Sequence, residues 1–108
     1  MTYQGRRREN QLIGDLPDDI EPGDYWLIVN EDGAPLKVNN SSNLTGCMWG
    51  FRAPIRGGIG TLSLHTVREH DDGTCSIQPG DGSSNSVLIT GGGGVFHGYL
   101  EHGIWRDA

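Results

Sequence analysis

Glycine is the feature that constrains this chain most, because it supplies 18 of the 108 residues. A glycine inside a helix or strand costs about 0.5–1 kcal/mol relative to alanine, whereas tight turns and close backbone contacts favour it. Asp-Gly pairs at 32–33 and 72–73 and four consecutive glycines at 91–94 separate short apolar or alternating segments. No segment shows the 3.6-residue apolar period of a helix. The pattern predicts an all-β fold of short strands and turns.

Residues 25–29 have the aromatic and β-branched profile of a strand that is buried on both faces. A turn at 31–34 and a returning segment at 35–38 complete a predicted hairpin. Strand signals recur every 8–15 residues, which indicates a small antiparallel β-sandwich or β-roll. Further strands are expected at 47–52 with a bulge at Gly50, and at 61–67, 74–77, 86–90, 95–100 and 104–106.

The first 23 residues differ in character from the rest of the chain. Residues 1–23 are polar and lack a periodic apolar pattern, so we expect an N-terminal arm that is ordered only where something packs on it. Residues 24–108 are expected to form a single β domain. Hydrophobic residues make up only 34% of the chain, and such a lean core favours a homo-oligomer that buries more surface.

Charge is unevenly distributed. The net charge is −6, and because Arg6, Arg7 and Arg8 contribute +3, the remainder carries −9. An acidic body repels a phosphate backbone, so nucleic acid is not an expected partner. The arginine triplet, together with Trp105 near the C-terminus, is expected to contact a partner. No apolar run approaches the roughly 18 residues of a membrane helix and no signal peptide is evident, so we expect a cytoplasmic protein without membrane contact.

Neither a metal site nor a catalytic centre has a local signature. Zinc sites use about four Cys/His ligands, commonly presented as close pairs, and no such pair occurs. A thiol nucleophile would need a nearby histidine and carboxylate, which the sequence does not bring together. We therefore expect free thiols, no metal, no cofactor and no catalytic residue. The residues weighed for these roles are Cys47, Cys75, His65 and His97, with His70 and His102 in turns and Asp81 or Glu101 as the carboxylate.

Two glycine-rich loops, 80–86 and 91–94, are the candidate ligand site. Their backbone N–H groups and hydroxyls could face an anion or a small polar ligand, although ordinary turn structure is the alternative. Neither loop is a P-loop, because the Lys-Ser/Thr pair and the following helix are missing. The candidate ligand-binding residues are Asp81, Ser83, Ser84, Asn85, Gly92, Gly93, His97 and Tyr99.

Two segments resemble a known group of proteins. Residues 60–65, Gly-Thr-Leu-Ser-Leu-His, and residues 96–105, Phe-His-Gly-Tyr-Leu-Glu-His-Gly-Ile-Trp, resemble small proteins of unknown function encoded by actinobacterial phages and their hosts. The resemblance covers about residues 47–106 and implies a phage or prophage origin. Part of that group has a Cys-His pair where this chain has Phe96-His97, and this departure weakens the case for transferring a metal site from the group.

Three functions follow as hypotheses. The first is a non-enzymatic, phage-type binding protein whose partner is a host protein, a defence protein, or a small polar ligand such as a nucleotide. The alternative is a structural virion protein, for capsid decoration or tail association, whose 1–23 arm contacts a neighbouring subunit. The third is a Cys/His metal-dependent or thiol hydrolase. A phage-encoded binder would act in the host cytoplasm, and a structural protein in the virion.

Overall fold

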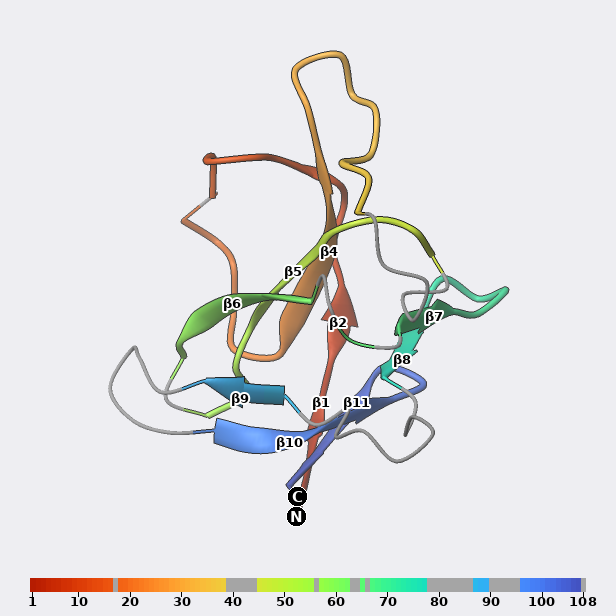
Figure 1. Ribbon diagram of the computed structural model, residues 1–108. Coiled ribbons are helices and arrows are strands. Elements are labelled where there is room, and N and C mark those ends of the chain that lie inside the picture. The colour runs from red at the N-terminus through yellow and green to blue at the C-terminus, as the bar shows by residue number, and fades with distance from the viewer. Residues whose placement is uncertain are drawn as a thin grey trace.

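All regular elements in the described part of the chain are β-strands (Figure 1), which confirms the all-β prediction. The computed structural model describes residues 1–16, 18–38, 45–55, 57–62, 65, 67–77, 87–89 and 96–107. The strands are β1 (Thr2–Gln4), β2 (Arg6–Arg7), β3 (Gln11–Leu12), β4 (Asp24–Val29), β5 (Trp49–Arg52), β6 (Ile59–Leu62), β7 (Val67–Glu69), β8 (Cys75–Ile77), β9 (Val87–Ile89), β10 (Phe96–Glu101) and β11 (Ile104–Asp107).

The strands form three sheets. One is antiparallel, with the order β1-β11-β10-β9, and another has the order β2-β4-β5-β6, with β3 also pairing with β4. The hairpin of β7 and β8 forms the third (Figure 1). A single main core joins residues from all three sheets. Its buried members are Tyr25, Trp49, Phe51, Ala53, Leu62, Val67, Cys75, Ile77, Val87, Phe96, Leu100 and Trp105. The choice between a sandwich and a roll stays a prediction.

The N-terminal residues are part of the sheets and do not form the expected arm. β1 pairs with β11, so that Tyr3 lies opposite Trp105. β2 and β3 run parallel to β4, with Arg6 opposite Asp24. The expected boundary at residue 24 therefore falls inside one sheet. Strands of two or three residues are too short to show an alternating pattern, and their ladder hydrogen bonds do not depend on apolar side chains.

The first predicted hairpin is confirmed in its first strand and its turn, whereas the returning segment 35–38 forms only isolated bridges, Pro35 with Val29 and Lys37 with Cys47. In β4 only Leu27 is less than fully buried, as expected for a strand covered on both faces. The Asn30 N–H donates to the Ala34 carbonyl at 2.9 Å, and the Asn30 side-chain oxygen accepts the N–H groups of Asp32 and Ala34. Gly33 has a φ of +80°, which explains the Asp-Gly pair in this turn.

Two local predictions are corrected. Gly50 is not a bulge, because it stands in regular register opposite Trp26 on one side and Thr61 on the other. The indole of Trp26 lies so close to Gly50 that a Cβ there would overlap it, so the position needs glycine for close approach. The predicted strand 61–67 is divided between β6, which ends at Leu62, and β7, which begins at Val67. Strands β8 to β11 occupy the remaining predicted segments.

Candidate functional site

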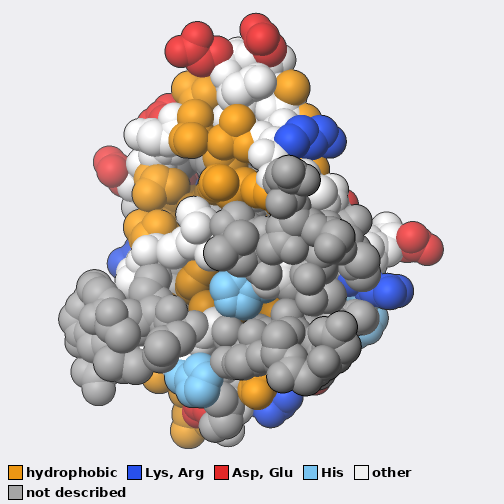
Figure 2. Space-filling model, in the orientation of Figure 1, with side chains coloured by type: hydrophobic (Ala, Val, Ile, Leu, Met, Phe, Trp, Pro, Cys, Tyr) orange, Lys and Arg blue, Asp and Glu red, His pale blue; other side chains and the backbone are white. Residues whose placement is uncertain are grey.

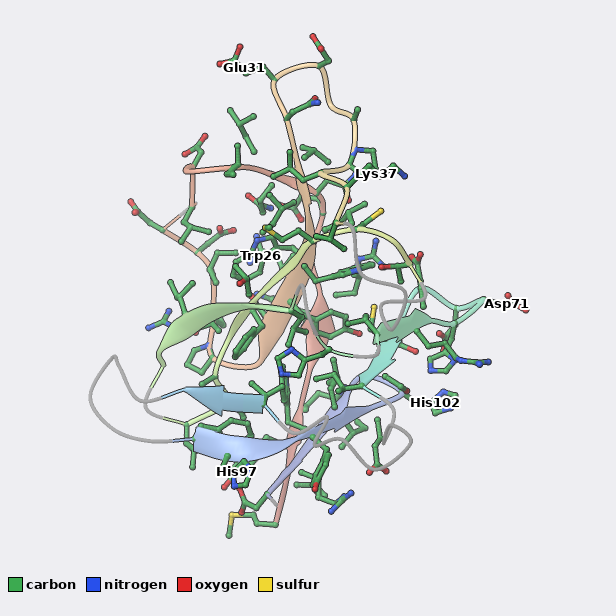
Figure 3. All side chains as sticks on the ribbon, viewed as in Figure 1. Trp26, Glu31, Lys37, Asp71, His97 and His102 are labelled. Atoms are coloured by element: carbon green, nitrogen blue, oxygen red, sulfur yellow. The ribbon has the colours of Figure 1, made fainter. Side chains whose placement is uncertain are left out.

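Most of the predicted ligand site lies outside the described residues. This applies to Asp81, Ser83, Ser84, Asn85, Gly92 and Gly93. His97 and Tyr99 share one face of β10, where His97 is exposed and Tyr99 half-buried. The Arg106 guanidinium lies 4.7 Å from the centre of the Tyr99 ring. Neither residue lines the two pockets described below. Figure 3 places His97 and His102 at opposite ends of β10.

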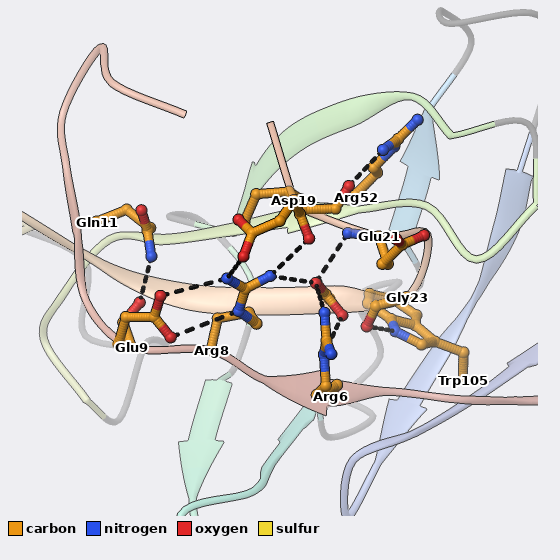
Figure 4. Close-up of polar contacts among 11 residues, drawn as sticks. Arg6, Arg8, Glu9, Gln11, Asp19, Glu21, Gly23, Arg52 and Trp105 are labelled. Atoms are coloured by element: carbon orange, nitrogen blue, oxygen red, sulfur yellow. Dashed lines mark hydrogen bonds and ion pairs between the residues drawn. The ribbon is translucent and has the colours of Figure 1, made fainter. Parts of the chain in front are cut away.

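Arg6 and Arg8 converge on one buried carboxylate, that of Asp24 (Figure 4). Arg6 donates to both Asp24 oxygens at 3.1 and 2.9 Å, and Arg8 donates to one of them at 3.0 Å. Arg8 also binds the carboxylate of Asp19 at 3.0 Å. Burial alone would raise the pKa of Asp24, but the hydrogen bonds from Arg6, the Glu21 N–H and Arg8 lower it overall. These contacts fasten the N-terminal segment to β4.

Arg7 makes contacts within its own chain as well. Its guanidinium donates to Glu69 at 2.9 Å and to the Gly73 carbonyl at 2.6 Å, and it lies 4.6 Å from the centre of the Trp49 ring. The three arginines expected at a partner surface therefore hold β2 against β4 and the β7–β8 hairpin. A run of arginines cannot show this from sequence, because the acceptors are distant in the chain.

Trp105 is a core residue, which corrects its expected role as a partner contact. Its side chain is 0% exposed, and its ring lies 5.5 Å from Phe51 and 5.7 Å from Phe96, measured between centroids. The indole N–H donates to the Gly23 carbonyl at 2.9 Å. Proximity to the C-terminus suggested exposure, but the pairing of β1 with β11 encloses this position.

Both cysteines are buried, and Cys75 has a thiol that resists ionisation. Cys75 is 1% exposed, and burial raises the pKa of its thiol to about 12. Cys47 is also buried, and the Lys37 ammonium lies 3.8 Å from its sulfur. Within the described ranges, no three His, Cys, Asp or Glu side chains gather as metal ligands do.

We expect Cys75 to resist thiol reagents in the folded protein. In a Cys47→Ser variant at about pH 8, reaction with dithionitrobenzoate should be about 100-fold slower than for free cysteine, because little thiolate forms and access is blocked. Absorbance of the released thiolate measures the rate. The same variant in guanidinium chloride should react like a free thiol. Rapid reaction in the native state would contradict the burial of Cys75.

Ser76 and two histidines join two turns, and the sequence does not predict this contact. The rings of His70 and His102 stack with centroids 3.7 Å apart. The Ser76 hydroxyl lies 2.7 Å from the His70 Nε2 and accepts the His102 N–H at 2.7 Å. Ser76 is only 6% exposed and lies outside both described pockets. The arrangement therefore ties the β7–β8 turn to the β10–β11 turn and offers no open nucleophile.

An apolar groove lies on the face of the β4-β5-β6 sheet that points away from the main core. It encloses about 310 Å³, and the exposed large apolar residues that line it are Ile13 (55%), Ile59 (49%), Leu16 (42%) and Leu12 (38%). In Figure 2, hydrophobic side chains gather in the upper part of the molecule. The groove is lined by Leu12, Ile13, Gly14, Leu16, Trp26, Ile28, Met48, Gly50, Ile59, Gly60 and Thr61.

The groove is formed by segments that are distant in the sequence. Residues 12–16 form one wall, β6 forms the other, and Trp26 and Ile28 of β4 form the floor. Trp26 and Ile28 pack with Ile20 in a second, smaller apolar cluster. The sequence carried one signal of this wall, namely the large apolar residues at 12, 13 and 16 in an otherwise polar segment.

A second pocket of about 540 Å³ lies beside β7 and β5. Its lining is mixed, and its two charged residues, Arg68 and Glu69, have opposite signs. This balance gives the pocket no preference for an anion or a cation. The lining residues are Leu27, Pro35, Thr45, Cys47, Trp49, Arg68 and Glu69.

No family model matches the chain, and comparisons with curated proteins and with solved structures found no match. Among the described residues, no helix has the length and apolar character needed to cross a membrane. The groove on the β4-β5-β6 sheet is therefore the principal guide to function.

Proposed function

We propose that this protein is a non-enzymatic binding protein that holds part of another protein in its apolar groove. The observation that carries the proposal is the exposure of Leu12, Ile13, Leu16 and Ile59 around one concave surface. A folded chain ordinarily buries such side chains, and a contiguous exposed apolar patch marks a site of interaction.

The composition of the groove supports a protein partner over a small polar one. Its floor is the indole of Trp26 with Ile28 and Met48, and the described residues that line it include no charged side chain. Protein-binding hot spots combine an aromatic anchor with an apolar pocket from which water is excluded. A nucleotide would bring phosphates to a surface where the described lining residues include no cation to receive them.

The other hypotheses stay predictions. A small-ligand site at loops 80–86 and 91–94 stays a prediction, because both loops lie outside the described residues. A virion subunit whose 1–23 arm contacts a neighbour would need β1, β2 and β3 to leave the sheets of their own chain. A phage or prophage origin and action in the host cytoplasm remain part of the proposal.

A charge placed in the groove should abolish partner binding. Peptides selected against the protein from a random display library should bind Ile59→Glu at least about tenfold more weakly, because a buried carboxylate without a partner is costly. Isothermal titration calorimetry measures the affinity. Ile55→Glu is the matched control, because Ile55 is exposed but does not line the groove. A selection that enriches no peptide, or peptides that bind both variants equally, would overturn the proposal.

A further inference from the structure

We infer that the occupant of the groove is an extended, basic segment of a partner protein that adds to β6 as a new strand. The inference rests on the proposed function and specifies the chemistry of the partner. Three observations carry it: the open edge of β6, the face on which its side chains lie, and the charge of the opposite wall.

Among the described strands β6 ends its sheet, and one of its edges pairs with none of them. The sheet order is β2-β4-β5-β6, and among the described strands only β5 pairs with β6. The Ala53 N–H donates to the Gly58 carbonyl at 2.7 Å. Hydrogen-bonded pairs alternate in an antiparallel ladder, so Gly60 and Leu62 also bond to β5. The N–H and C=O groups of Ile59 and Thr61 therefore point outward.

The same two residues place their side chains in the groove. Ile59 and Thr61 are exposed and line it, whereas Leu62 turns into the main core. A strand that hydrogen-bonds to Ile59 and Thr61 would set every second side chain on this face. Backbone pairing and alternate side-chain pockets then act together, as in recognition by strand addition.

The wall opposite β6, residues 12–16, contains one carboxylate, that of Asp15, and continues into an acidic segment. Residues 12–21 include Asp15, Asp18, Asp19 and Glu21 but no lysine or arginine. Arg8 pairs with Asp19, whereas Asp15 and Asp18 make no ion pair within the described part of the chain. Figure 2 shows acidic side chains at the margin of the hydrophobic surface.

Charge complementarity selects the occupant. Lysine or arginine in the occupant would be attracted to the carboxylates of residues 15–21, which favours association with the correct partner. A second copy of this chain would bring the same acidic segment and a net charge of −6 to the interface, so like charges would oppose it.

Two synthetic peptides test the inference: acetylated, amidated Lys-Val-Thr-Val-Thr-Val-Lys and its counterpart with both lysines replaced by glutamate. The basic peptide should bind at least about tenfold more tightly. Asp15→Lys should remove this preference. Asp71→Lys makes the same charge change in the exposed β7–β8 turn and should preserve it. Equal binding of both peptides would overturn the basic character of the partner.

Amide hydrogen exchange by NMR tests strand addition directly on the unmodified protein. Saturation with the basic peptide should slow exchange at Ile59 and Thr61 by about tenfold or more, because their N–H groups become hydrogen-bonded. If the peptide binds and Ile59→Glu abolishes that binding, but amide exchange at Ile59 and Thr61 does not change, strand addition is overturned. Binding in the groove would still stand. A second copy of the chain would be the occupant if the unmodified protein binds no peptide and sediments as a dimer that Ile59→Glu disrupts. That result would overturn the inference.

Discussion

Asp24→Ala should lower the free energy of unfolding by about 3 kcal/mol, because it leaves the buried guanidinium of Arg8 without its buried partner. Asp24 is 1% exposed and Arg8 9% exposed, so little water can replace the lost contact. The variant also removes the acceptor for Arg6 and for the Glu21 N–H. Denaturation in urea measures the change. The strand that should loosen first is β2, which the Arg6 contact fastens to β4.

Asp19→Ala is the control for this prediction. Asp19 contacts the same guanidinium of Arg8 at 3.0 Å, but its side chain is 72% exposed. Exposed ion pairs contribute about 0–1 kcal/mol, so this variant should remain close to wild type. Equal losses for the two variants would show that burial of the Asp24 carboxylate is not the source of its effect.

The pKa of Asp24 predicts how stability depends on pH. A carboxyl whose pKa is lowered in the folded state contributes stability above its unfolded pKa of about 3.9, and this contribution is lost as pH falls through the lower folded value. Asp24→Asn lacks the titrating group. The difference in unfolding free energy between wild type and Asp24→Asn should therefore shrink as pH falls below about 4. A difference that stays constant from neutral pH to about pH 3 would contradict the lowered pKa.

The parts of the fold that the sequence predicts are those with local causes. The strand at 25–29 follows from its aromatic and β-branched residues, and the turns at 31–34 and 71–73 from their Asp-Gly pairs. Each of these signals lies within a few residues of the structure it specifies. The sequence predicts β8 to β11 from local signals of the same kind.

The parts that the sequence does not predict depend on distant segments. β2 and β3 contain two residues each and pair with β4, and Asp24 also binds Arg6 of β2. The groove combines residues 12–16 with β4, β5 and β6, so its walls come together only in the folded chain. The sequence also does not predict that Gly50 lies under the Trp26 indole. Glycine in a strand is typical of a bulge and of a close contact alike, so the residue type does not distinguish them.

Trp105→Ala should lower the free energy of unfolding by about 3–5 kcal/mol, the range for removing a large aromatic side chain from a core. The indole is fully buried between Phe51 and Phe96, and its loss would leave a cavity where two sheets meet. The buried Gly23 carbonyl would also lose the N–H that binds it at 2.9 Å. Urea denaturation at neutral pH measures the total effect.

Trp105→Phe separates the two contributions. Phenylalanine keeps part of the aromatic packing but cannot donate to Gly23, whose carbonyl keeps the Arg6 N–H at 3.3 Å, so it should cost about 1 kcal/mol for the lost hydrogen bond plus a smaller packing loss. Trp105→Ala must then be the more destabilising of the two variants. If Trp105 were an exposed partner contact, both substitutions would change the stability of the isolated chain by less than about 0.5 kcal/mol. That outcome would contradict the buried position of Trp105 and the pairing of β1 with β11 that encloses it.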